Sequence, residues 1–402
     1  MNTGETQCIL VGGGPAGVIA ALLLARRGVE VTLLEMHKDF DRDFRGDTVH
    51  ASTLEILDQI GLAEPLHALP HAKMRTVTLQ TPKRAIPVVD FGRLKTRYPY
   101  VMIMPQFEFL EFLTEQARAY PNFHLRMGAQ VVDVLRRRDR TLGVKFMQDG
   151  EAHELRAPLT VACDGRFSRM RKIQQLEAPG QAPPMDVAWL RLPRRADDRF
   201  EAGVFYIGHG HMLVMLNRPD AWQIGYVLPK GDFSSVKEMG LDAFRSSMSD
   251  LAPWLTDRTS AITAWHDVHL LSVKSDLLPR WHYPGLIFIG DAAHVMSPVF
   301  GVGINYAIAD AVELVNAAAD ELLRGDVTET TLAEVQRRRE RPTRMIQRMQ
   351  AAVQERVVQR ALAGREFDLP LIAKMLLRVP GLRDIPARII ASGLKPVRLA
   401  RV

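Results

Sequence analysis

The chain has 402 residues, of which 47% are hydrophobic and 24% are charged, and its formal net charge is +6. This length predicts two or three domains, and the composition is that of a globular protein rather than of a disordered or fibrous one. The mild basic excess suits phosphate-bearing cofactors or anionic substrates. Because no compact basic and aromatic patch stands out, we expect no nucleic-acid partner.

The two cysteines, Cys8 and Cys163, are too few for a disulfide framework or a cysteine-rich metal site, and we expect no bound metal. Both lie in apolar strand-like runs, which predicts buried, inert thiols in a reducing, cytoplasmic compartment. The N-terminal MNTGETQ lacks the features of a signal peptide. No apolar run of the sequence reaches the length of a membrane span.

Residues 8–35, CILVGGGPAGVIAALLLARRGVEVTLLE, predict a buried strand, a glycine-rich turn, a helix and a second strand. Gly12, Gly14 and Gly17 form a G-x-G-x-x-G fingerprint, in which glycine permits a tight turn, a close pyrophosphate and close helix packing. Glu35 ends the second strand, where a carboxylate can bind ribose hydroxyls. The sequence therefore predicts a dinucleotide site, and the alternative is a tight turn in an empty α/β fold.

The rest of the chain contains segments typical of α/β units and segments typical of an antiparallel sheet. A short helix capped by Ser52 or Thr53, an amphipathic helix beginning at Gln106 and a hairpin over residues 122–150 follow the first unit. From about Pro179, alternating strands predict an antiparallel sheet with one covered face. The remaining predictions are a buried strand, glycine-rich loop and long helix over residues 284–323, and an arginine-rich helical segment from residue 328 onward.

Three stretches, taken together and in this order, resemble the single-component FAD-dependent aromatic hydroxylases of the para-hydroxybenzoate hydroxylase type. They are GGGPAG at 12–17, CDGRFSRMRK at 163–172 and GDAAHVMSPVFGVGIN at 290–305. The resemblance covers roughly residues 5–325. It implies FAD as the resident cofactor, with NADH or NADPH as a transient co-substrate.

The resemblance also implies an α/β fold built around a Rossmann-type, glutathione-reductase-like FAD-binding domain that is interrupted by a mainly antiparallel substrate domain. A helical C-terminal segment would complete the chain. The expected boundaries are 1–73, 101–176 and 277–325 for the FAD-binding domain, 74–100 and 177–276 for the substrate domain, and 326–402 for the C-terminal segment.

The resemblance assigns a role in binding FAD to particular residues of this chain. Asp291 and Gln106 would contact the ribityl chain, the backbone of Val131 the adenine, and Asp164 the pyrophosphate. Read without the resemblance, Gln106 is a helix-start residue and Val131 a core valine. The full set of expected contacts is Gly12, Gly14, Pro15, Ala16, Gly17, Glu35, Arg45, Gln106, Val131, Asp164, Asp291, Gly301, Gly303, Ile304 and Asn305.

The implied reaction is hydroxylation of a phenol-like or polycyclic aromatic substrate. NAD(P)H reduces FAD, O2 adds to the flavin to give a C4a-hydroperoxide, and its distal oxygen passes to the aromatic ring. We expect the substrate between the sheet and the loop 298–303, with Trp222, Tyr226, Pro298 and Phe300 lining the pocket. The sequence singles out no catalytic base; the candidates by residue type are His50, His209, His211, Tyr226 and His294.

Three alternatives remain open. A flavin-dependent halogenase would carry W-x-W-x-I-P, but the nearest stretch, AWQIGYVLP at 221–229, lacks the second tryptophan. A reductase of isoprenoid double bonds would share the fold, and a non-catalytic FAD-binding protein would have no need of the second glycine-rich loop.

The apolar, basic C-terminal tail would either contact a membrane surface or, as we favour, pack over the domains.

Overall fold

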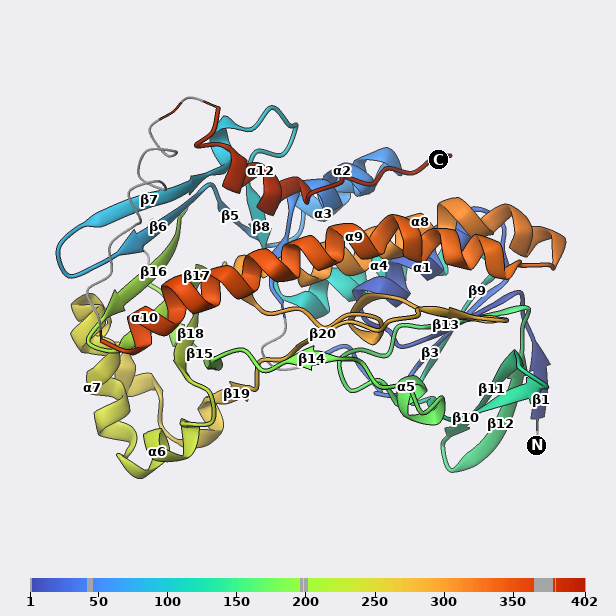
Figure 1. Ribbon diagram of the computed structural model, residues 1–402, viewed down its shortest axis with the longest axis horizontal. Helices are drawn as coiled ribbons and strands as arrows, with labels where there is room; N and C mark the ends of the chain where they lie inside the picture. The colour runs from blue at the N-terminus through green and yellow to red at the C-terminus, as the bar shows by residue number, and fades with distance from the viewer. Residues whose placement is uncertain are drawn as a thin grey trace.

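The computed structural model describes residues 2–41, 46–195, 198, 202–364, 379 and 381–401. Figure 1 shows two sheet-containing parts side by side, with the long helix α9 (Glu329–Val353) running across both of them. The α/β fold with a Rossmann-type unit that the sequence predicts is confirmed. The division into domains at the expected boundaries stays a prediction.

The first part is built on a six-stranded sheet in the order β21-β22-β13-β2-β3-β9, in which all neighbours except β21 and β22 pair in parallel. Every residue of the strands β13, β2 and β3 is buried, as expected for a parallel sheet covered on both faces. The strands are β2 (Cys8–Val11), β3 (Val31–Glu35), β9 (Phe123–Met127), β13 (Leu159–Ala162), β21 (His282–Tyr283) and β22 (Leu286–Phe288).

Helices cover one face of this sheet, and a second sheet covers the other. Leu10 and Leu33 pack against α1 (Pro15–Arg26), α4 (Gln106–Arg118) and α8 (Gly303–Arg324). The opposite face packs against a four-stranded sheet that contains the predicted hairpin. That sheet consists of β1 (Asn2–Glu5), β10 (Gln130–Arg137), β11 (Arg140–Gln148) and β12 (Glu151–Arg156).

The neighbouring parallel strands β22, β13 and β2 end at the same edge of the sheet. Each of them runs into one of the three sequence motifs: Gly12 follows β2, Cys163 follows β13 and Gly290 lies two residues after β22. In an open α/β sheet, ligands bind outside the carboxyl ends of the strands. Strand order therefore brings together motifs that lie more than 100 residues apart in the sequence.

The second part is a seven-stranded sheet in the order β19-β15-β18-β17-β16-β6-β7. Its pairs are antiparallel except β16 and β6, which are parallel, so the prediction of a mainly antiparallel sheet holds. Two separate pieces of the chain form it. The strands are β6 (Thr76–Gln80), β7 (Ala85–Asp90), β15 (Met185–Pro193), β16 (Ala202–Gly208), β17 (His211–Asn217), β18 (Ala221–Pro229) and β19 (His269–Leu271).

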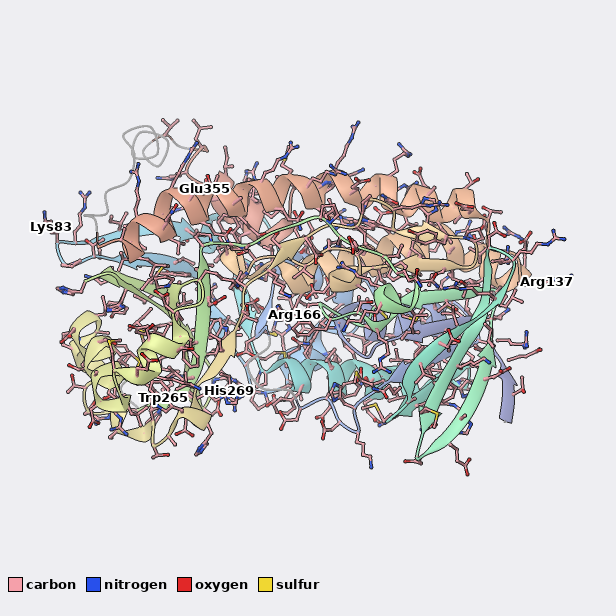
Figure 2. The ribbon with its side chains drawn as sticks, turned by 60° about the horizontal axis from the view of Figure 1, so that its bottom comes forward. Lys83, Arg137, Arg166, Trp265, His269 and Glu355 are labelled. Atoms are coloured by element: carbon pink, nitrogen blue, oxygen red, sulfur yellow. The ribbon has the colours of Figure 1, made fainter. Side chains whose placement is uncertain are left out.

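The prediction that only one face of this sheet is covered is wrong. In β18, every residue from Trp222 to Leu228 is buried. One face packs under the helices α6 (Phe233–Glu238) and α7 (Leu241–Leu251), and the other packs toward Val299 and Val358. Figure 2 shows Trp265 of the helical layer at the end of the molecule opposite Arg137 of the β10–β11 hairpin.

A three-stranded sheet in the order β4-β8-β5 lies beside α2 (Ala51–Gln59), which precedes α3 (Ala63–His67). The N-cap of α2 is His50, two residues before the expected Ser52, and no side chain caps this helix. Thr53 cannot cap it, because its hydroxyl donates to Asn305 instead. The small strands here and elsewhere are β4 (Thr48–Val49), β5 (Ala72–Met74), β8 (Val101–Ile103), β14 (Gly180–Gln181) and β20 (Ser275–Asp276), and α5 spans Arg169–Ile173.

The helices α8 and α9 complete the fold. By length and apolar composition the stretch Val299–Arg324 would suffice to cross a membrane, which corrects the expectation that no such run exists. Most of it is buried inside the protein, as in a core helix of a globular fold. After α9 the chain continues through a π-helical turn (Gln354–Val358) into α10 (Gln359–Leu362).

The described part of the C-terminal tail packs on the first part of the molecule. The helix α12 (Ile385–Ser392) buries Ala387, Ile390 and Ala391 in the core that α2 and α8 share. Beyond it, the backbone N–H of Leu399 donates to Gln59 at 3.0 Å. The interpretation of the tail as a packed segment agrees with these contacts.

Both cysteines are buried and without a disulfide, as predicted. Cys8 lies in β2, where burial raises its pKa far above the usual range, so the inert thiol form prevails. Cys163 lies beside the glycine-rich turn, and its Sγ is 3.3 Å from the carbonyl oxygen of Gly12.

The packing of the tail predicts unequal effects of two isoleucines in α12. Ile390→Ala should lower the free energy of unfolding by about 2 to 4 kcal/mol, because it removes buried methylenes from a filled core. Ile385→Ala, at a 42% exposed position of the same helix, should change it by less than about 0.5 kcal/mol. Urea unfolding measures both, and equal effects would contradict this placement of the tail.

Candidate functional site

The three motifs pack directly against one another at the carboxyl edge of the six-stranded sheet. A Cβ added at Gly12 would lie 2.6 Å from the carbonyl oxygen of Cys163, and Gly12 has a φ of 111°. A Cβ at Gly17 would lie 2.0 Å from the carbonyl oxygen of Gly12. These two glycines are therefore required by the protein itself, because any side chain would separate the turn from its neighbours.

Gly14 and Gly303 are different, because the protein alone gives no reason for glycine there. Neither has a positive φ, and a Cβ at either would meet nothing within 4 Å. Among the glycines of the described chain, only these two combine both properties. Each leaves open space beside backbone at a helix N-terminus, which is the arrangement expected where a ligand approaches the main chain.

Both helix ends leave backbone N–H groups available. The helix α1 begins after Gly14 and α8 begins at Gly303, and neither has a side-chain cap or an acidic residue in its first turn. The first N–H groups of a helix have no partner within it, and its dipole is positive at this end. An anionic or electron-rich group placed in either open space would be stabilised.

Glu35 lies directly under the glycine-rich turn. It is 2% exposed, and its two carboxylate oxygens accept hydrogen bonds from the backbone N–H of Gly13 at 2.6 Å and of His37 at 2.9 Å. The backbone carbonyl of Glu35 accepts from Ala129, which brings β10 to this position. Val131 of β10 has a buried side chain in the core, so only its backbone could contact a ligand.

The turn after β13 is stabilised by Asp164, a residue of the turn itself. Asp164 accepts from the Ser168 hydroxyl at 2.6 Å and from the Met170 backbone N–H at 2.9 Å, and it thereby holds Ser168, the N-cap of α5. Burial raises the pKa of Asp164, while these hydrogen bonds oppose the rise. Arg166 of the same turn lies between the two parts of the molecule in Figure 2.

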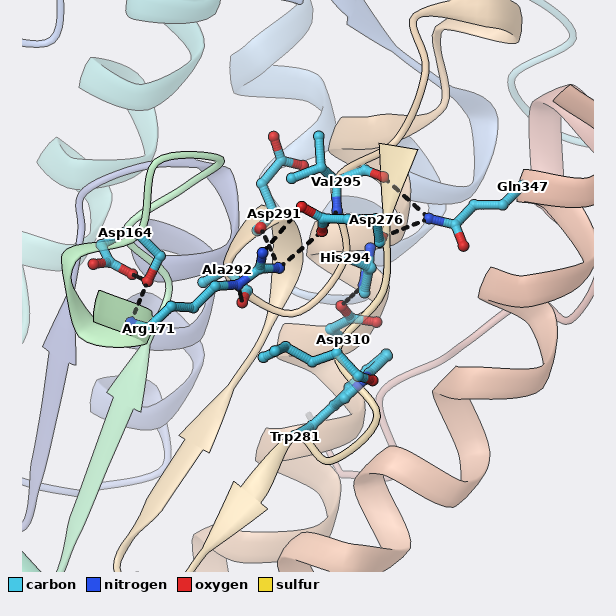
Figure 3. A network of polar contacts seen from close by, with 12 residues as sticks. Asp164, Arg171, Asp276, Trp281, Asp291, Ala292, His294, Val295, Asp310 and Gln347 are labelled. Carbon is cyan, nitrogen blue, oxygen red and sulfur yellow. Dashed lines mark hydrogen bonds and ion pairs between the residues drawn. The ribbon is translucent and has the colours of Figure 1, made fainter. Parts of the chain in front are cut away.

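Arg171 connects this turn to the third motif. Its guanidinium forms two hydrogen bonds to Asp276, at 3.0 and 3.1 Å, and donates to the backbone carbonyls of Ala292 and Asp291. Figure 3 shows the Asp291 carboxylate pointing away from the Arg171–Asp276 pair. The main chain at 291–292 is thus fixed by Arg171, while the side chain of Asp291 is directed elsewhere.

A buried carboxylate, Asp310 of α8, holds the start of the third motif. It accepts from the backbone N–H of Gly290 at 3.0 Å, from His294 Nε2 at 2.6 Å and from Arg339 Nε at 2.8 Å. Burial alone would raise the pKa of Asp310, but His294 and Arg339 together lower it. His294, a candidate base by residue type, is 1% exposed and engaged in this structural network (Figure 3).

The glycine-rich loop before α8 packs on the segment that begins at Gly46. A Cβ at Gly46 would lie 2.8 Å from Ile304, and the hydroxyl of Thr48 donates to the carbonyl of Gly301 at 3.0 Å. The same added Cβ would lie 3.9 Å from the Gln106 side-chain oxygen at the start of α4. Gln106 begins its helix as predicted. Arg45, the other expected contact in this segment, lies outside the described residues.

Two polar side chains near this loop keep a buried nitrogen without a partner. Asn305 accepts from the Thr53 hydroxyl at 2.9 Å, which orients its amide and leaves Nδ2 as an unused donor. His50 donates from Nδ1 to the Ile390 carbonyl at 2.8 Å, and its Nε2 has no partner. Burial lowers the pKa of His50 to about 4, so its ring is neutral near pH 7.

The structure separates the four expected pocket residues into two groups. Trp222 donates to Asp198 at 2.8 Å, and Tyr226 hydrogen-bonds His211 at 2.7 Å; both lie on the face covered by α6 and α7. Pro298 and Phe300 belong to the loop near the opposite face. The expectation that all four line one cavity is wrong, because β18 presents its alternate residues to opposite sides.

The sheet face toward this loop carries a different set of side chains. Trp189, Phe205 and Val214 are half-buried and lie in the same apolar cluster as Val299. They lie on β15, β16 and β17 in register with Gly225 of β18, the strand between β15 and β17. A Cβ at Gly225 would lie 3.0 Å from the Trp189 ring. The sequence did not single out these residues, because alternation predicts two faces but not which face meets the loop.

A buried polar group lies at one end of this face. Arg218 donates to Gln223 at 3.1 Å, and its guanidinium is 3.5 Å from the carboxylate of Asp47. Burial raises the pKa of Asp47 to about 6, although Arg218 and Arg191 oppose the rise. Asp47 stands between Gly46 and Thr48, which contact the glycine-rich loop, so this group joins the loop to the sheet.

Comparison with known proteins identifies related sequences and folds. A family model described as FAD binding domain matches residues 5–349. The chain is 30% identical over 387 residues to a 6-methylpretetramide 4-monooxygenase from Streptomyces rimosus, covering 96% of this chain and 92% of that protein.

Two solved structures share the fold. A p-nitrophenol 4-monooxygenase from Pseudomonas putida superposes with a TM-score of 0.78 at 20% identity, covering 100% of each chain. A flavin-dependent brominase has the same TM-score at 16% identity, covering 98% of this chain and 94% of that one. At these identities, the two structures show the fold alone.

The site fits FAD. The space at Gly14 lies beside a helix N-terminus suited to a pyrophosphate, and the space at Gly303 lies beside a second one suited to the electron-rich edge of a ring. The buried donor of Asn305 lacks an acceptor that a ring carbonyl would supply. The individual contacts expected for FAD stay predictions.

The two classes of glycine predict opposite phenotypes. Gly14→Ala should leave the stability of the apoprotein within about 1 kcal/mol of wild type, since nothing surrounds the added methyl. It should weaken FAD binding at least tenfold, because the methyl occupies the space for the pyrophosphate. Gly17→Ala should destabilise the apoprotein itself, because its Cβ would overlap the carbonyl of Gly12.

Fluorescence titration with FAD and thermal unfolding of the apoproteins distinguish the two. Wild-type FAD affinity in Gly14→Ala would contradict a pyrophosphate at this position.

The raised pKa of Asp47 predicts a pH-dependent contribution to stability. The folded protein binds this proton more tightly than the unfolded chain, so the contribution of Asp47 falls as pH rises from about 4 to about 6. The stability of Asp47→Asn relative to wild type should therefore increase over this interval, by at most about 3 kcal/mol. Urea unfolding from pH 4 to 7 measures the difference.

Asp242→Asn, at an exposed carboxyl of α7, serves as the control for general effects of charge. A stability difference for Asp47→Asn that does not change with pH would argue against a raised pKa.

Proposed function

This chain belongs to the FAD binding domain family and is an FAD-dependent monooxygenase, and we propose that it hydroxylates a phenol-like or polycyclic aromatic compound. In the overall reaction, an aromatic C–H becomes C–OH, O2 supplies the oxygen, NAD(P)H supplies two electrons, and the second oxygen atom leaves as water. The observation that carries the proposal is the pair of open glycine positions, Gly14 and Gly303, each beside an uncapped helix N-terminus.

FAD, when bound, supplies the redox chemistry, accepting electrons from NAD(P)H and activating O2. The protein binds and orients it. The N-terminus of α1 at Gly14 would hold the pyrophosphate, and Glu35 would hold the ribose beside it. Asp291 and Gln106 would bind the ribityl chain, because Asp291 points away from the structural network and Gln106 contacts the Gly46 segment.

The N-terminus of α8 would bind the ring end of the cofactor. Its backbone N–H groups at Gly303 and Ile304 offer donors, and the helix dipole favours negative charge at this point. Fixed donors of this kind stabilise charge without reorganising during the reaction. Asn305 adds a side-chain donor that is buried and oriented by Thr53.

The aromatic substrate would lie between this loop and the sheet face that carries Trp189, Phe205 and Val214. These half-buried apolar side chains suit a flat aromatic ring system. The polar group of Asp47, Arg218 and Gln223 at one end of the face would bind substrate hydroxyls. An apolar wall with polar groups at one end favours a polycyclic phenol, in keeping with the name of the 30% identical relative.

Halogenation is the second candidate function, because a flavin-dependent brominase shares the fold. The missing second tryptophan of the 221–229 stretch favours hydroxylation. The two reactions give products of different mass. An assay that contains chloride and bromide distinguishes them directly.

The test is oxidation of NADH and of NADPH by the purified protein with a panel of simple phenols and polycyclic aromatics, followed by mass spectrometry. We expect at least one aromatic to accelerate oxidation and to gain one oxygen atom, with a larger response to polycyclic compounds. A halogenated product would favour the alternative. If no aromatic accelerates oxidation or changes mass, the proposed function fails.

A cytoplasmic location and a peripheral membrane contact through the C-terminal segment also remain proposals. The packed α12 supports an internal structural role for the tail. Co-sedimentation of the full chain with anionic lipid vesicles tests the membrane contact, and a protein that stays in the supernatant would argue against it.

A further inference from the structure

One side of α9 and of the π-helical turn after it carries three glutamines, Gln347, Gln350 and Gln354, which we call the glutamine row. Spacings of three and four residues place them on the same side of the helix. Gln347 Nε2 donates to the backbone carbonyls of Asp276 and Val295, at 2.9 and 3.0 Å (Figure 3). The first residue of the row thus contacts Asp276, which is also the partner of Arg171 in the network around the third motif.

The other two glutamines hold the turn at Pro298. Gln350 is 1% exposed, and its Nε2 donates to the carbonyls of Ser297 and Val299, at 3.0 and 2.8 Å. Gln354 Nε2 donates to the Ser297 hydroxyl at 2.5 Å, and that hydroxyl also accepts from the Val299 backbone N–H. Three hydrogen bonds from α9 and the π-helical turn after it thus hold the residues on both sides of Pro298.

The residue that follows this turn has an unfavourable conformation. Phe300 has a φ of 71°, in the left-handed region where an aromatic side chain is disfavoured. Such a conformation persists only where the surroundings impose it. The carbonyl before Phe300, that of Val299, is held by Gln350, and the carbonyl after it, that of Gly301, is held by Thr48.

We propose that Gln350, supported by Gln354, is a positioning residue for residues 297–301, which we call the cofactor-ring loop. It acts through the main chain of residues 297–301, which it holds in the conformation that leads into Gly303 and the N-terminus of α8. The inference rests on the proposed function, because the loop matters only if the ring of FAD lies against it. No motif marks Gln350, which lies 45 residues after the last residue of the third motif, Asn305.

Gln350→Met tests this proposal, since methionine has a similar length but donates no hydrogen bond. The matched control is Gln359→Met, at an exposed position of α10. We measure the dissociation constant of FAD, the flavin midpoint potential, and the share of NAD(P)H oxidation that yields hydrogen peroxide. We expect weaker FAD binding, a shifted potential and more peroxide, with hydroxylation slowed about tenfold to a hundredfold, as for ångström-scale misplacement of reacting groups.

A double-mutant cycle provides a milder test should Gln350→Met fail to fold. Gln354→Met and Ser297→Ala each disrupt the same hydrogen bond, so their effects on FAD affinity and potential should not add. The proposal is overturned if the row variants lower only the melting temperature. In that case their FAD affinity, potential and peroxide share would match those of Gln359→Met.

These outcomes are distinguishable from failure of the proposed function. If wild-type protein converts no aromatic substrate, the proposed function fails. FAD affinity and the potential, measured by chemical reduction without substrate, then still decide whether Gln350 positions the cofactor loop.

Discussion

The arrangement of the site depends on the hydrogen bonds that the buried carboxylate of Asp310 accepts. This carboxylate is fully buried and accepts hydrogen bonds from Gly290, His294 and Arg339, which belong to the turn after β22, the loop that follows it and the helix α9. A buried charge that lacks even one of its partners is strongly unfavourable, so these contacts have to form together. Forming them fixes α8, α9 and the turn after β22 relative to one another, and the glutamine row and the cofactor-ring loop follow from that arrangement.

Open space beside the backbone, rather than a set of reactive side chains, distinguishes the candidate site. Gly12 and Gly17 are explained by the atoms that surround them, whereas Gly14 and Gly303 face open space at two helix ends. A family of enzymes whose chemistry resides in a cofactor has less need of a catalytic side chain than of a well-shaped binding site. The site that we propose accordingly uses backbone N–H groups and a buried amide as its principal recognition elements.

Much of the fold could be predicted from local pattern. The G-x-G-x-x-G unit, the start of α4 at Gln106 and the hairpin of β10 and β11 each have a signal within a few residues. The faces of β18 could not be assigned, because alternation is uninformative when helices cover one side and a distant loop meets the other. Asp47 and Gln350 were also beyond prediction: one lies in a charged loop and the other in an arginine-rich helix, and only tertiary contacts distinguish them from solvent-facing neighbours.

The continuity of α9, the π-helical turn and α10 limits how this protein can be recombined with its relatives. Gln350 contacts the loop of residues 297–301, while Val358 and Ala361, two and three turns later, are packed against the seven-stranded sheet. A chimera that exchanges residues 185–271 for those of another protein would leave these two side chains against a foreign surface. Residues 354–362 therefore belong with the exchanged sheet in any graft, although they lie more than 80 residues beyond it in the sequence.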